Sequence, residues 1–134
     1  LEALGYTATL YSFSDSNDLA AVTETAVAAS DVIYVPTDNT VAANVGIIDN
    51  ICQPVGIPVI AGEEGVCAGC GVATLSISYY DLGYTTGEMA AQILKGEADI
   101  STMKIEYAPA TRKYNPEICK ELGLTAPEGY KAIG

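Results

Sequence analysis

Short apolar runs alternate with amphipathic stretches through the first half of this chain. Residues 6–13, 32–35 and 57–61 are rich in apolar or β-branched side chains, a composition typical of strands. Between these runs, apolar side chains recur at helical spacing over residues 19–27 and 41–52. Strands and helices that alternate through short connections indicate a parallel sheet covered by helices. We therefore expect an α/β fold.

A longer helix is predicted over residues 81–96 in the second half. Asp81 can cap its first turn, and Gly96 suits the left-handed position at its end. The other elements expected here are strands over residues 72–78 and 103–107 and a short helix over residues 115–122. The chain has 134 residues, which is enough for one ordinary domain.

Polar residues gather where the expected strands end. Right-handed crossovers bring the carboxyl ends of parallel strands to one edge of the sheet, and ligands bind in the crevice beyond that edge. We therefore expect the loops over residues 14–18, 36–40 and 62–71 to lie together there. The candidate ligand-binding residues are Ser14, Asp15, Thr37, Asp38, Asn39, Glu63, Glu64, Tyr79 and Asp81.

Each candidate also has a plain structural interpretation. Ser14, Asp15 and the Thr37–Asn39 turn suit helix caps, the paired glutamates suit a solvated loop, and Tyr79 suits a packed junction. In the functional interpretation, Asp38 and either glutamate bind a ligand ammonium, while Thr37 and Asn39 contact its carboxylate or backbone-like part. Both interpretations stay open at this point.

The net charge is −11, and it is unevenly distributed. Residues 1–94 hold eleven acidic residues and no Lys or Arg. A ligand carboxylate bound there needs backbone N–H, hydroxyl or amide donors, whereas an ammonium finds carboxylates. Such a surface repels nucleic acids and anionic membranes. The chain also lacks His, so a Ser-His-Asp or Cys-His device cannot be built from it alone, and we expect neither catalysis nor a cofactor.

Cys67 and Cys70 form a C-x-x-C motif, which occurs in redox pairs and as half of a zinc site. A second such motif is absent, and Cys52 and Cys119 stand alone. Three interpretations therefore remain: simple loop thiols, a disulfide, or a metal or redox site. No complete metal-ligand set is visible in the sequence.

Three strings carry a family resemblance: SDVIYVPTDNTVAANV, IPVIAGEEG and YYDLGYTTGEMAAQILKGEA. In this order and spacing, over residues 30–94, they resemble the solute-binding proteins of ABC transporters. The similarity is to the branch of the type I periplasmic-binding-protein fold that takes amino acids, some of them aromatic. A later string, ICKELGLTAPEGY, extends the resemblance more weakly toward residue 134.

The resemblance implies two α/β lobes with a ligand trapped between them. It implies that this chain is the C-terminal portion only, without the N-terminal lobe and the first β-α unit of the second lobe. Residues 1–73 then belong to the C-terminal lobe, residues 74–100 form a crossover and a helix that packs on the N-terminal lobe, and residues 101–134 return. Since the chain opens on Leu1, we expect the protein to begin upstream. Apolar surfaces left without a partner favour self-association or element swapping.

The function implied by the resemblance is capture of an amino acid or similar zwitterion for an ABC transporter permease. The protein is then extracytoplasmic, either periplasmic or lipid-anchored at the outer face of the cell membrane. Two alternatives remain: a ligand-sensing regulatory domain of the same fold, and a C-x-x-C redox or metal protein.

Overall fold

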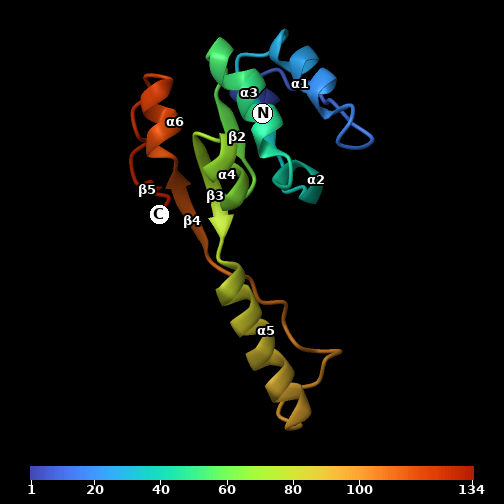
Figure 1. Ribbon diagram of the computed structural model, residues 1–134. Coiled ribbons are helices and arrows are strands. Elements are labelled where there is room, and N and C mark those ends of the chain that lie inside the picture. The colour runs from blue at the N-terminus through green and yellow to red at the C-terminus, as the bar shows by residue number, and fades with distance from the viewer.

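The computed structural model describes residues 1–134 and contains one five-stranded sheet with helices beside it (Figure 1). The strands are β1 (Ile33–Val35), β2 (Val59–Ala61), β3 (Ala73–Ile77), β4 (Ala110–Tyr114) and β5 (Lys131–Ala132), in this spatial order. β1, β2 and β3 are parallel, β4 runs antiparallel to β3, and β5 is parallel to β4. The α/β prediction is confirmed, with a mostly parallel sheet.

Helices fill the connections as the hydrophobic pattern predicts. They are η1 (Glu2–Leu4), α1 (Leu19–Val27), α2 (Asn39–Ala42), α3 (Val45–Cys52), η2 (Gln53–Val55), α4 (Glu64–Cys70), α5 (Tyr79–Leu94) and α6 (Pro116–Glu121). The helix expected over residues 41–52 is broken at Asn44, whose side-chain amide donates to the Thr40 carbonyl at 2.8 Å. An asparagine that bonds nearby backbone in this way competes with a continuous helix.

The main core lies between the helices and one face of β1 and β2. It contains Leu19, Val35, Val41, Ile48, Cys52, Val59, Ala61, Val66, Cys67 and Cys70. Each large side chain buried there contributes roughly 1.5–3 kcal/mol. The other face of the sheet is open at β1 and at the middle of β3, since Tyr34 is 64% exposed and Leu75 is 59% exposed. Sheets with several parallel strands are usually covered on both faces, so this chain leaves apolar surface uncovered.

A smaller core joins α6 to the sheet and contains Val72, Ala73, Ile118 and Cys119. Asn115 connects it to α4. Its side-chain oxygen caps α6 by accepting from the Glu117 and Ile118 amides, and its Nδ2 donates to the Cys67 carbonyl at 3.1 Å. The predicted helix over residues 115–122, with Pro116 in its first turn, is confirmed.

Three sequence-based element predictions are wrong. Residues 6–13 form no strand, because residues 7–13 make no backbone hydrogen bond, and strand propensity needs a neighbouring strand to act on. Residues 103–107 are also outside the sheet, and the returning strand is β4. The glycine-rich segment 62–71 is largely helix α4, because burial of Val66 and the two cysteines outweighs the low helix propensity of its glycines.

Helix α5 protrudes from the rest of the molecule (Figure 1). It follows β3 directly, and the chain then returns along residues 95–109 to β4. None of its 16 residues is buried. The predicted helix end is confirmed, with Gly96 at φ +73°, but the cap is Ser78 rather than Asp81, because the helix begins one turn earlier. None of the helices combines the length and apolar character that crossing a membrane requires.

Candidate functional site at the strand ends

The turns after β1 and β2 lie against each other at one edge of the sheet. The Thr37 hydroxyl donates to the Gly62 carbonyl at 3.3 Å. Gly62 permits this approach, because a Cβ at that position would lie 2.7 Å from the Thr37 nitrogen. The prediction that segments 36–40 and 62–65 share an edge is therefore confirmed.

Asp38 and Asn39 begin α2 at this edge. Asp38 Oδ1 accepts from the Val41 amide at 2.9 Å, so the carboxylate caps the helix, as the structural interpretation predicted. Its other oxygen has no partner in the protein, and the side chain is only half-buried. Asn39 is exposed and its side chain makes no hydrogen bond within the protein. This turn can therefore cap a helix and still offer an acceptor and an amide to a ligand.

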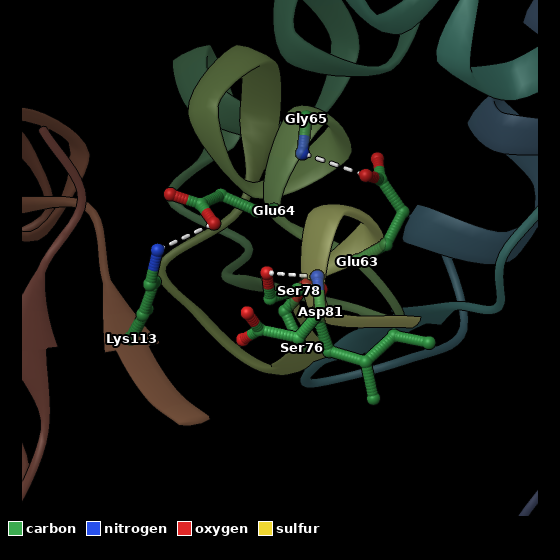
Figure 2. A network of polar contacts seen from close by, with 8 residues as sticks. Glu63, Glu64, Gly65, Ser76, Ser78, Asp81 and Lys113 are labelled. Atoms are coloured by element: carbon green, nitrogen blue, oxygen red, sulfur yellow. Dashed lines mark hydrogen bonds and ion pairs between the residues drawn. The ribbon is translucent and has the colours of Figure 1, made fainter. Parts of the chain in front are cut away.

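Glu63 and Glu64 have different tasks, although they are neighbours (Figure 2). Glu63 caps α4, with one carboxylate oxygen accepting from the Gly65 amide at 2.8 Å and the other from the Val66 amide. Glu64 accepts from the Lys113 ammonium, with Nζ and Oε2 2.6 Å apart. The solvated-loop interpretation does not hold for either residue.

Lys113 is the site residue that sequence reasoning missed. It lies on β4, opposite Thr74 of β3, and reaches across to the first turn of α4. Recognising it requires β4 to be identified as the partner of β3, and the polar sequence of β4 gives little sign of that. The pairing of β3 with β4 places Lys113 opposite Thr74, and the ion pair with Glu64 then joins two residues 49 positions apart in the chain.

A cavity of about 230 Å³ lies beside this ion pair, between the start of α4, the end of β3 and the start of β4. Its lining residues are Glu63, Glu64, Ser76, Ile77, Ser78, Tyr79, Thr111 and Lys113. Both charge signs, three hydroxyls and an aromatic ring therefore meet in one place. A wider hollow of about 520 Å³ lies at the far end of α5, but its only charged side chains, Glu97 and Asp99, are acidic, and no strand ends there.

Tyr79 and Asp81 lie at the start of α5, next to the cavity. Tyr79 lines it. The Asp81 amide donates to Ser78 Oγ at 3.1 Å, and its carboxylate makes no hydrogen bond within the protein (Figure 2). The structure thus brings Tyr79 together with Glu63 and Glu64, as expected for cavity-lining residues, and places Asp81 one helical turn beyond the strand end.

Ser14 and Asp15 are held in a separate loop before α1. The amides of both residues donate to the Asp18 carboxylate, and these bonds, the one from Ser14 first, lower the pKa of Asp18. Asp15 in turn accepts from the Asn17 amide at 2.7 Å. No hydrogen bond joins this loop to the turns at Thr37 and Glu63, and neither Ser14 nor Asp15 caps α1, whose N-cap residue is Asp18.

The four cysteines are buried and unpaired. Burial is the main cause that raises the pKa of Cys67 and of Cys70 to about 12. Their thiols donate to carbonyls within α4 and just beyond it, at 3.4–3.5 Å. No group of three or more His, Cys, Asp or Glu side chains is arranged to hold a metal ion. The C-x-x-C motif here packs as a pair of small apolar side chains.

Over 85 residues, 63% of this chain and 25% of the relative, the sequence is 35% identical to the tyrosine-binding protein of Clostridioides difficile strain R20291. The fold matches a ligand-free, open substrate-binding protein with adhesive properties from Clostridium difficile, with 34% identity and a TM-score of 0.76. It also matches an ABC domain in complex with L-Trp from Streptococcus pneumonia, with 28% identity and a TM-score of 0.85.

These solved structures are longer than this chain. The two matches cover 98% of this chain but only 45% and 46% of the solved chains. The chain thus spans a quarter of the curated relative and under half of the solved structures. Residues 4–132 match the family described as ABC transporter substrate binding protein. This chain therefore belongs to the family of ABC transporter substrate-binding proteins.

Proposed function

We propose that this chain forms one wall of an extracytoplasmic site that captures an amino acid, with an aromatic one preferred, for import by an ABC transporter. The observation that carries the proposal is the contact between the turns at Thr37 and Gly62, which gathers polar groups at the carboxyl ends of parallel strands. Ligands of open α/β sheets bind at such edges. The family, and relatives whose names and titles record tyrosine and L-Trp, support the ligand class.

Asp38 is our choice for the ligand ammonium. Its second oxygen is free of the capping bond, and a charge-assisted hydrogen bond to it is stronger than a neutral one. Asn39 supplies an amide from the same turn. Glu63 is less suited to this role than its sequence position suggests, because both of its oxygens already accept backbone amides.

The protruding helix α5 fits a two-lobed arrangement. Its aromatic and aliphatic side chains, among them Tyr80, Tyr84 and Leu94, are exposed. Apolar surface of this extent is normally covered. In the proposed protein, residues 74–100 leave the C-terminal lobe and pack on an N-terminal lobe, and residues 101–134 return. Closure of two lobes about a ligand then presents a shape that the permease recognises, without a chemical step.

Calorimetry tests the ligand class. The complete protein, as its gene encodes it, is titrated with the twenty amino acids and with short peptides. We expect heat and saturation with at least one amino acid, and the tightest binding with an aromatic one. An Asp38→Asn variant keeps the helix cap, because Asn also caps, but loses the charge. Its affinity is expected to fall about tenfold or more. Absence of binding to every amino acid would overturn the proposal.

A further inference from the structure

The ion pair beside the cavity offers more bonding capacity than the protein uses. A lysine ammonium has three donors, and Lys113 directs one of them to Glu64. The other Glu64 oxygen has no partner in the protein. The side chains are 28% and 37% exposed, so the pair is reachable from solvent. A spare cationic donor therefore lies in a hollow open to a small molecule.

The surroundings of Lys113 are polar on the helix-covered face of the sheet. Thr111 lies opposite Ser76, and Lys113 lies opposite Thr74, in the register of β3 and β4. Ser76 and Thr111 line the cavity with Lys113. The Thr74 hydroxyl, in a side chain only 1% exposed, has no hydrogen-bond partner. Hydroxyls beside a cation are the donor set that a carboxylate accepts from.

The charge distribution makes Lys113 distinctive. No residue from 1 to 94 is basic, and Lys113 is the only basic residue that lines the cavity. The cavity volume of about 230 Å³ is below the roughly 300–1,000 Å³ of sites that enclose a whole ligand. It therefore suits the carboxyl end of a ligand, with the rest of the ligand outside the cavity.

We propose that Lys113 binds the carboxylate of the captured amino acid and that Glu64 is a positioning residue that holds the ammonium in place. This inference rests on the proposed function and adds to it the group that recognises the acid end of the ligand. It makes Lys113 the residue that distinguishes an amino acid from the amine without its carboxyl group. A neutral hydroxyl or amide would give a weaker preference, because hydrogen bonds to charged groups are the stronger ones.

Paired titrations of the complete protein test this inference. The probes are the amino acid that binds tightest and the amine that lacks only its carboxyl group; L-tyrosine with tyramine is the first pair. In Lys113→Met, affinity for the amino acid should fall about tenfold to a hundredfold, while affinity for the amine changes less than threefold. Lys113→Arg should restore most of the amino-acid affinity. Lys120→Met is the matched control, because Lys120 is exposed on α6 and does not line the cavity.

The outcomes separate the two proposals. Unchanged amino-acid affinity in Lys113→Met, or an equal loss for amino acid and amine, overturns the role of Lys113 and leaves amino-acid capture intact. Failure of the unmodified protein to bind any amino acid overturns both. If Lys113→Met does not fold, Glu64→Gln replaces it. Releasing Lys113 from its positioning partner should then lower affinity for the amino acid at least threefold while affinity for the amine changes less, and an unchanged amino-acid affinity overturns the inference.

Discussion

Helices α4 and α5 follow neighbouring strands, yet they are stabilised in opposite ways. α4 has only seven residues, two of them glycine, and buries Val66, Cys67 and Cys70. α5 has 16 residues and a well-defined apolar stripe, but buries none of them. Tertiary packing thus maintains a helix of poor propensity, while a longer helix relies on its own hydrogen bonds. The comparison shows that an apolar stripe on a helix predicts that the helix is buried, but it does not tell which part of the protein covers that stripe.

A charge placed in each helix gives the largest expected contrast. Val66 is fully buried in α4, so Val66→Asp should cost about 4 kcal/mol or more, because an unpaired carboxylate is then forced into the core. Leu94→Asp at the exposed end of α5 should change the free energy of unfolding of this chain by less than about 0.5 kcal/mol. Denaturant unfolding followed by circular dichroism measures both. Equal losses would show that α5 packs as tightly as α4.

Thiol reactivity provides the next contrast. Burial raises the pKa of Cys52 to about 11 and the pKa of Cys67 and Cys70 to about 12, from 9.0. The thiolate fraction near pH 8 is then lower by about a hundredfold to a thousandfold, and labelling by a disulfide reagent should be slow until the chain unfolds. The free energy of unfolding depends on pH for the same reason. The raised pKa values of these thiols contribute fully to stability below pH 9, and this contribution is lost as the pH rises through 11 to 12. Rapid labelling of the folded chain would contradict this expectation.

The close contact between the two ligand turns predicts an intermediate effect. Gly62→Ala forces a methyl group against the Thr37 nitrogen and should cost about 1–3 kcal/mol. Amino-acid affinity should fall with it, since the turns separate. Gly46→Ala in α3 is the control, because no atom lies within 4 Å of the added methyl. That change should be neutral or stabilise by about 0.5–1 kcal/mol. Thermal unfolding of both variants decides the matter.

Glycines inside α5 predict the smallest effect and sharpen the comparison. Nothing lies within 4 Å of a Cβ built at Gly83 or Gly87. Replacing either by Ala should stabilise the helix by roughly 0.5–1 kcal/mol and raise helical circular dichroism. Gly96→Ala should have the opposite sign, because φ is +73° there. If Gly83→Ala and Gly87→Ala lower the helical signal, a surface approaches that side of α5 more closely than the structure shows.

The sequence allowed the alternation of strands and helices, the shared edge of the two turns, the cap of α2 and the presence of α6 to be predicted. The helices, the strands and the cap depend on neighbours in the chain, so local periodicity and turn chemistry report them. The shared edge follows from the right-handed crossovers between parallel strands. The errors have a common physical origin in distant contacts. Residues 6–13 have the composition of a strand but lie beside no strand with which they could pair. Helix α4 forms because the sheet and α3 bury its apolar side chains.

The same reasoning explains what was missed in the site. Asp38, Glu63 and Glu64 were named as candidates, because each follows a strand that the sequence reveals. Lys113 was not, because its strand has a polar sequence and its partner lies 49 positions away. The different roles of Glu63, which caps α4, and Glu64, which pairs with Lys113, also depend on this distant contact. The sequence therefore predicted the edge of the sheet where the candidate residues lie, and the structure added Lys113 to them.

The exit from the sheet at Ile77 and the return at Ala110 are paired opposite each other. Helix α5 has 16 residues, so at 1.5 Å per residue it extends about 24 Å from this connection. The connection between α5 and the sheet therefore runs through this one pair of residues. Thr111 follows Ala110 directly and lines the cavity together with Lys113, so a change in the angle of α5 would begin next to the wall of the cavity.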